Sequence, residues 1–217
     1  MKGNIKKLSV FVIIAAIAMF VVVGMASADH TFRKALRGEY AVTAVMICLV
    51  SSKGFDGNLT PIDPALTTCN PITFQGISTF KHDGTGRLDT TGVLIVPAPV
   101  PVPQLPHANA FHFSFTFTYD VADDDTITID ADKDSFQVTF DTGPLPPGNG
   151  FKADKYSLSG RVSADHKTLT LGSPTTLIQT STFINTPISF NMICNGSYVF
   201  TRVGPIERGG EPWERCQ

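Results

Sequence analysis

Four aspartates are spaced like the oxygen ligands of a calcium-binding loop. Asp130, Asp132 and Asp134 fall at its first, third and fifth positions, and Asp141 falls at its twelfth. Carboxylate oxygens are ligands that Ca²⁺ prefers, so these residues are a candidate metal site. Against it, Ser135 stands where such a loop needs glycine, and residues 136–140 alternate apolar and polar side chains as a strand does. We therefore favour a solvated hairpin turn here and predict no metal, with the calcium site as the alternative.

The four cysteines are Cys48, Cys69, Cys194 and Cys216. An even number of cysteines in an exported protein predicts two disulfides. No two of them have the Cys-x₂-Cys spacing of common zinc sites, so a cysteine-ligated metal is not expected. We predict Cys48–Cys194 with Cys69–Cys216, and the alternative is the local pairing of Cys48–Cys69 with Cys194–Cys216.

No catalytic set can be recognised in the sequence. The Gly-x-Ser-x-Gly turn that exposes a serine nucleophile is absent, and no glycine-rich phosphate loop precedes a helix. We therefore predict no catalytic residue and no cofactor, and we favour a protein that binds over an enzyme.

Residues 1–28 have the three parts of a secretory signal peptide. Lys2, Lys6 and Lys7 form a positive start, an apolar run extends from Leu8 to Val23, and residues 26–28 have the small-x-small form of a cleavage site. We predict cleavage before Asp29 and export to the periplasm or the cell exterior. An uncleaved N-terminal anchor is the alternative. No later apolar stretch is long enough for a transmembrane helix, so no stable membrane span is expected after cleavage.

Charge excludes one class of partner. Loss of the three lysines in the leader would change the formal net charge from −2 to −5. A nucleic-acid partner is not expected, because its binding surface needs a basic cluster and none remains. The rest of the chain is long enough for one domain with a substantial core, which we place at residues 29–203, followed by an exposed tail at 204–217.

The clearest structural signal is an alternation of aromatic and polar residues. Five aromatic side chains occupy every second position from Phe111 to Tyr119, separated by histidine, serine and threonine. Only the two-residue repeat of a β-strand places all five on one face. This strand must therefore border a core or a ligand cavity with the side chains of Phe111, Phe113, Phe115, Phe117 and Tyr119.

Similar short segments run through the rest of the domain, separated by glycine, proline and aspartate. Short connections favour antiparallel neighbours, and no amphipathic helix is evident. We predict an all-β, antiparallel up-and-down β-barrel of about eight or nine strands, with a β-sandwich as the alternative. The ten candidate segments from which these strands would form span 40–50, 72–82, 87–96, 111–119, 126–130, 135–142, 156–163, 167–171, 175–183 and 188–203.

One register would close this barrel. If the first and last strands pair so that Cys48 lies opposite Cys194, Tyr40 comes opposite Arg202 and Val42 opposite Phe200. Directly opposed residues lie close enough for a disulfide. The apolar residues of both strands then share one face, so a bridge between Cys48 and Cys194 would hold the closing seam.

Gly38-Glu39-Tyr40 resembles the Gly-x-Trp opening of the calycin barrels, the lipocalin and avidin group, with tyrosine in place of tryptophan. The resemblance implies a late basic residue across the ring, a place that Arg202 could fill through a cation–π contact. The chain also resembles uncharacterised exported bacterial proteins at residues 40–43, 83–86 and 193–194. That second resemblance implies no known activity.

We expect a secreted barrel that binds a small apolar molecule of unknown identity. The residues expected to line its cavity are Phe111, Phe113, Phe115, Phe117, Tyr119, Tyr40 and Arg202. The alternative is a structural or protein-interaction module whose barrel is filled and whose segments 51–70 and 97–106 meet a partner. A third possibility is an enzyme on a related scaffold, similar to the allene oxide cyclase barrel. The sequence does not indicate an oligomeric state.

Overall fold

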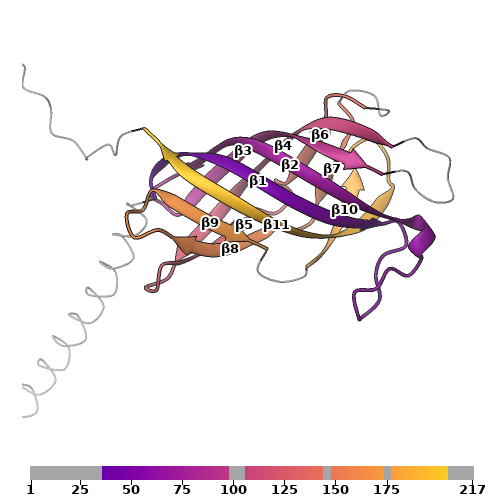
Figure 1. Ribbon diagram of the computed structural model, residues 1–217, viewed down its shortest axis with the longest axis horizontal. Helices are drawn as coiled ribbons and strands as arrows, with labels where there is room; N and C mark the ends of the chain where they lie inside the picture. The colour runs from indigo at the N-terminus through magenta and orange to yellow at the C-terminus, as the bar shows by residue number, and fades with distance from the viewer. Residues whose placement is uncertain (1–35, 98–105, 144–147, 174–176, 205–217) are drawn as a thin grey trace, which may run out of the picture.

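The protein is described by a computed structural model that covers residues 36–97, 106–143, 148–173 and 177–204 (Figure 1). The predicted signal peptide 1–28 and nearly all of the predicted tail 204–217 lie outside the described residues. No helix in the described part is long and apolar enough to cross a membrane. The elements are β1 (Gly38–Ser51), the 3₁₀ helix η1 (Pro64–Leu66), β2 (Thr67–Phe80), β3 (Thr85–Val96), β4 (His107–Val121), β5 (Thr126–Ala131), β6 (Gln137–Phe140), β7 (Gly150–Ala153), β8 (Ser157–Val162), β9 (Thr168–Gly172), β10 (Ile178–Phe183) and β11 (Ser189–Val203).

All the named strands belong to one antiparallel sheet that closes on itself. Five long strands, β1 to β4 and β11, extend along the molecule, as Figure 1 shows. At one end β5, β8 and β9 connect β4 to β11, and at the other end β6, β7 and β10 make the same connection. Each end is therefore a ring of eight strands. This arrangement confirms the predicted all-β, up-and-down fold, and the closed ring favours a barrel over a sandwich.

The six short strands are three long ones, each interrupted near the middle of the barrel. β5 and β6 both pair with β4, where Tyr119 lies opposite Ile129 and Phe111 lies opposite Phe140. Phe111 and Tyr119 are eight residues apart on β4, whereas their partners Ile129 and Phe140 are eleven residues apart. Three extra residues therefore bulge out between β5 and β6. The hairpin turn expected around Asp132 is therefore wrong. β5 and β6 follow each other along one edge of β4 and do not pair with each other.

The closing seam has the register that the sequence predicts. Along β1 and β11, Cys48 lies opposite Cys194, Tyr40 opposite Arg202 and Val42 opposite Phe200. Cys48 and Cys194 form a disulfide, which excludes the local pairing of Cys48 with Cys69. Cys69 is exposed and makes no disulfide with the described residues. The predicted Cys69–Cys216 bridge is not tested, because Cys216 lies outside the described residues.

Alternation along the strands separates the core from the outer face. On β1 the even-numbered residues from Tyr40 to Cys48 are buried, whereas the odd-numbered Val45 and Ile47 are exposed. On β4 the aromatic residues from Phe111 to Tyr119 are all buried. The predicted aromatic face therefore points into the barrel, as the two-residue period requires.

Glycines allow this interior to close in two places. Gly38 starts β1 with a φ of +121°, a backbone conformation that other residues rarely adopt. At Gly86 on β3, an added Cβ atom would lie 2.3 Å from the ring of Phe117 on the paired strand. The aromatic ring therefore takes the space that a side chain on β3 would need.

The observed strands depart from the expected ones most clearly at β7 and β2. β7 lies between the expected strands 135–142 and 156–163, where no strand is expected, because its four residues are too few to show a period. β2 begins at Thr67, before Pro71, although proline usually ends a strand. The pairing of β2 with β3 begins only at Ile72, so Pro71 lies where β2 has β1 as its one strand partner.

We predict that replacing both seam cysteines, as Cys48→Ala with Cys194→Ala, lowers the free energy of unfolding by about 2–5 kcal/mol. The bridge closes a loop with a sequence separation of 146 residues, so its loss releases a large unfolded-state entropy. Urea unfolding followed by circular dichroism measures the change. Reductant is the matched control, because it should destabilise the wild type far more than the double variant. An unchanged unfolding midpoint in the double variant would contradict this role.

Candidate functional site: a cavity in one half of the barrel

A cavity of about 510 Å³ occupies the half of the barrel that β6, β7 and β10 close. Its wall is mainly aromatic and aliphatic, with a few polar side chains, among them His107. The apolar residues are Met46, Val50, Leu66, Ile72, Phe74, Leu94, Val96, Phe111, Phe113, Phe136, Val138, Phe140, Phe151, Phe183, Ile188, Phe190 and Met192. Among the described residues, the lining contains no lysine, arginine, aspartate or glutamate.

The inner limit of the cavity is a cluster of aromatic rings at the middle of the barrel. The ring of Phe136 lies 4.8 Å from that of Phe113 and 5.0 Å from that of Tyr156, measured between centroids. Phe115 stacks on Phe136 at 6.1 Å and is not itself part of the cavity lining. These four rings form a partition across the barrel, which we call the waist.

The waist exists because the short strands are interrupted there. Phe136 and Tyr156 lie at the breaks between β5 and β6 and between β7 and β8, outside regular strands. The break beside Phe136 is held to β4 by Ser135, whose hydroxyl donates to the carbonyl oxygen of Thr116 at 3.0 Å. A bulge re-aims side chains, and here both aromatic rings are turned into the barrel, where they are 4–5% exposed.

The other half of the barrel is filled. The centroid of the Phe80 ring lies 5.1–6.2 Å from those of Tyr40, Phe117, Tyr119 and Phe200. The guanidinium of Arg202 lies 5.9 Å from the centroid of the Tyr40 ring, and its Nη2 donates to the carbonyl oxygen of Arg37 at 2.6 Å. The predicted contact between Arg202 and Tyr40 is therefore present, and it caps this filled end.

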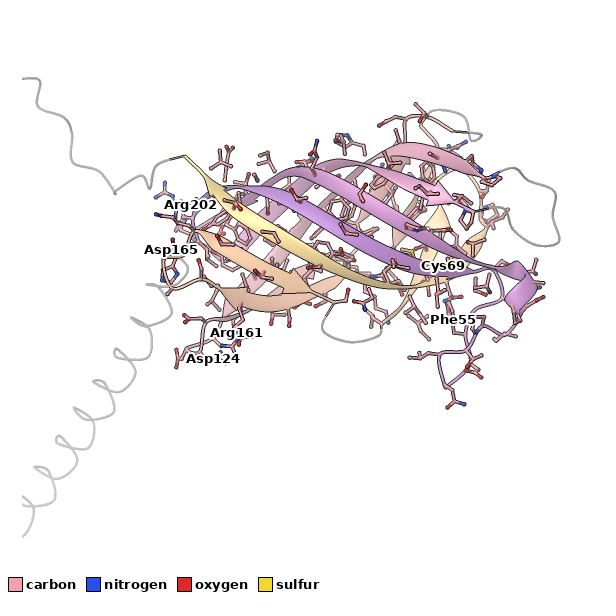
Figure 2. All side chains as sticks on the ribbon, viewed as in Figure 1. Phe55, Cys69, Asp124, Arg161, Asp165 and Arg202 are labelled. Atoms are coloured by element: carbon pink, nitrogen blue, oxygen red, sulfur yellow. A yellow bond between two sulfur atoms is a disulfide. The ribbon has the colours of Figure 1, made fainter. Side chains whose placement is uncertain are left out.

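The residues predicted to line a cavity are thus divided between the two halves. Phe111 and Phe113 line the cavity. The other predicted residues, Phe115, Phe117, Tyr119, Tyr40 and Arg202, are not among its lining residues and lie at the waist or in the filled half. Figure 2 shows Arg202 at the filled end of the barrel, far from Cys69 and Phe55 at the end that holds the cavity.

The cavity has an opening at its outer end. Leu66 and Ile188 both line it, yet they are 41% and 60% exposed, so apolar side chains stand at its mouth. Leu66 belongs to η1, in the segment 52–66 that joins β1 to β2 at this end of the barrel (Figure 1). Cys48 and Cys194 are also part of the lining, so the seam disulfide forms part of the cavity wall.

A chain of hydrogen bonds joins the cavity wall to the core at the waist. The hydroxyl groups of Tyr156 and Tyr198 lie 2.5 Å apart, and the Tyr198 hydroxyl lies 3.2 Å from the sulfur of Met46. Burial raises the pKa of Tyr198 to about 12, and burial also raises the pKa of Tyr156 well above its ordinary value. Both phenols therefore stay neutral at physiological pH.

The aspartate loop does not assemble a metal site in the described part of the chain. Asp130 lies in β5, Asp132 and Asp134 lie in the following bulge, and Asp141 follows β6. The described residues contain no group of three His, Cys, Asp or Glu side chains that could hold a metal ion. The backbone of Asp132 instead donates to Thr116 and accepts from Ser135, so this loop secures the bulge beside β4.

Three polar lining residues have no recognisable signal in the sequence. Asn70, Asn109 and Gln179 are each no more than 6% exposed, and each has a buried amide oxygen with no hydrogen-bond partner. Asparagine and glutamine are ordinary residues of exposed loops, and Asn70 precedes a proline. Only the strand register shows that they face inward.

Comparison with known proteins finds no family model that matches the chain and no curated protein with a matching sequence.

We predict that the buried tyrosines resist ionisation until the protein unfolds. The pKa of Tyr198 rises from 10.0 in an exposed phenol to about 12 in the folded protein, so between these values the native state binds more protons than the unfolded chain. The free energy of unfolding should therefore be independent of these phenols below about pH 10 and fall as the pH rises toward 12. Tyrosinate absorbance and circular dichroism, followed together in an alkaline titration, measure this coupling. Full ionisation of all four tyrosines with native circular dichroism would contradict it.

We also predict that the two halves respond differently to the loss of an aromatic ring. Phe117→Ala, in the filled half, should lower the free energy of unfolding by about 3–5 kcal/mol, because it leaves a void among packed rings. Phe183→Ala, at a partly exposed cavity residue, is the matched control and should cost much less. Equal losses in thermal or urea unfolding would mean that the two halves are packed alike.

Proposed function

We propose that this protein is a calycin-like β-barrel that binds a small, largely apolar molecule in the half closed by β6, β7 and β10. The observation that carries the proposal is the cavity of about 510 Å³. Ligand sites are typically concave, mainly apolar and about 300–1,000 Å³ in volume. Burial of apolar ligand surface against aromatic walls supplies the driving force for binding.

The opposite end of the barrel supports the likeness to calycins. β1 begins at Gly38, the ring of Tyr40 two residues later is fully buried, and Arg202 on the last strand lies over that ring. This is the arrangement implied by the Gly-x-Trp resemblance, with tyrosine in place of tryptophan. The closed ring of eight strands is the architecture that such a likeness implies.

The proposal includes export from the cytoplasm. The disulfide between Cys48 and Cys194 fits an oxidising compartment, because cytosolic thiols are normally kept reduced. The charged start, apolar run and small-residue site of residues 1–28 support delivery through a cleaved signal peptide to the periplasm or the cell exterior. A small-molecule binder would then meet its ligand outside the cytoplasm.

The alternative of an interaction module with a filled barrel has less support, because half of the interior is hollow. Its expected contact segment 97–106 lies mostly outside the described residues. One feature still favours a protein partner: Val45, Ile47, Val93 and Ile95 are 41–60% exposed on the outer face of β1 and β3. Analytical ultracentrifugation distinguishes the two proposals, because a partnered outer face predicts self-association or a stable complex.

We predict that the fluorescent apolar probe N-phenyl-1-naphthylamine binds the wild-type protein and that Thr68→Trp weakens its binding about tenfold or more. Thr68 lines the cavity, so an indole there should occupy space that the probe needs. Thr73→Trp is the matched control, because Thr73 is exposed and lies on the outer face of the same strand. The enhancement of probe fluorescence on titration measures both affinities. Equal affinities for the two variants, or no binding to the wild type, would overturn the proposal.

A further inference from the structure

Two buried amide groups in the cavity wall lack the hydrogen bonds that burial normally requires. Asn70 is 6% exposed and Gln179 is 5% exposed, and both line the cavity. The Oδ1 atom of Asn70 and the Oε1 atom of Gln179 are buried and have no hydrogen-bond partner among the described residues. Leaving a buried acceptor unpaired destabilises a fold, so each such group in a native structure calls for a partner.

The strand register places these two amides on either side of the closing seam. Asn70 on β2 lies opposite Cys48, and Gln179 on β10 lies opposite Met192 of β11. Met192 in turn lies opposite Val50, two residues along β1 from Cys48. The amides therefore flank the seam disulfide from β2 and β10, one inward-facing position apart along the barrel.

A third amide is oriented differently. The Oδ1 atom of Asn109 is also unpaired, but it lies so close to Gly143 that a Cβ atom on that glycine would be 1.6 Å from it. This oxygen is therefore turned toward the segment after β6.

The chemistry of the remaining lining narrows the class of ligand. The described residues that line the cavity include no acidic side chain, lysine or arginine, and their one imidazole is the half-buried His107 at the start of β4. A cation would therefore lose its hydration without gaining an opposite charge, and an anion would have at most this one imidazole. The unpaired atoms of Asn70 and Gln179 are acceptors. They call for a neutral partner that donates hydrogen bonds.

We propose that the ligand is a neutral molecule with an apolar body and at least one hydroxyl or N–H group, and that Asn70 and Gln179 accept hydrogen bonds from it. This inference rests on the proposed function and specifies the recognised group. The aromatic and aliphatic walls surround the body of the ligand, while the two amides at the seam select for the donor. A site built to hydrogen-bond a donor rejects an analogue that lacks it, because its own acceptors then stay unpaired.

Three probes of similar size test this on the full-length protein. 2-Naphthol carries a donor, 2-methoxynaphthalene carries an acceptor only, and 2-methylnaphthalene carries neither. Each is measured by displacement of N-phenyl-1-naphthylamine. We expect 2-naphthol to bind about tenfold more tightly than either analogue, which corresponds to ~1.4 kcal/mol.

Substitutions then assign the preference to the two amides. Asn70→Leu and Gln179→Met replace each amide with an apolar side chain of similar length. They should lower the ratio of the affinity for 2-naphthol to the affinity for 2-methylnaphthalene from about ten toward one, while 2-methylnaphthalene still binds. Because they remove unpaired buried acceptors, they should also raise the melting temperature of the ligand-free protein. The matched controls are Asn195→Leu and Gln75→Met, at exposed positions on β11 and β2, and they should keep the full preference.

The outcomes separate this inference from the proposed function. If all three probes bind equally well, the cavity binds apolar molecules but water satisfies the amides, and the donor selection is overturned. Tight binding of 2-methoxynaphthalene would also overturn it, because the amides would then be donating. A lower melting temperature in the Asn70 and Gln179 variants would show that the amides have structural partners instead. If none of the probes binds, the proposed function itself fails.

Discussion

The antiparallel pairing of β1 with β11 is the constraint on which the rest of the barrel depends. It gives the first and last long strands a second neighbour, so the sheet closes into a ring and leaves no long exposed edge. It also sets the register that points Tyr40, Cys48 and Cys194 inward together. The disulfide then holds that register covalently, at a sequence separation of 146 residues.

Closure encloses an interior, and the breaks in the short strands determine which part of it is filled by aromatic rings and which part stays open. A continuous eight-stranded barrel can be filled by its own side chains along its whole length. Here the breaks bring Phe136 and Tyr156 to the waist, where their rings meet Phe113 and Phe115. Aromatic rings pack together in the half that β5, β8 and β9 close, and the cavity occupies the half that β6, β7 and β10 close. The packed half therefore supplies buried aromatic surface, and the other half holds the cavity in which we propose that a ligand binds.

The sequence predicted the parts of this structure that depend on a short period or on pairing between chain ends. The alternating aromatics of 111–119 identify an inward face, and the matched positions of Cys48, Tyr40 and Arg202 identify the seam. It did not predict the waist, because bulge residues such as Phe136 belong to no regular period. It predicted only Phe111 and Phe113 of the cavity wall, and it missed Asn70 and Gln179, since these become inward-facing only through a register that their own segments do not encode.

The unpaired amides lie in the half of the barrel that holds the cavity, and their cost in stability has to be offset elsewhere. Each buried, unsatisfied amide costs about 1–3 kcal/mol, which a small barrel tolerates only if other interactions offset it. The seam disulfide lies between the two amides, and the filled half supplies packed aromatic burial at the other end. An apolar wall would be more stable and would bind apolar surface equally well, but it would not distinguish a hydroxylated molecule from its hydrocarbon. In the proposed site, buried acceptors without protein partners would make that distinction, because a donor on the ligand would supply the hydrogen bond that they lack.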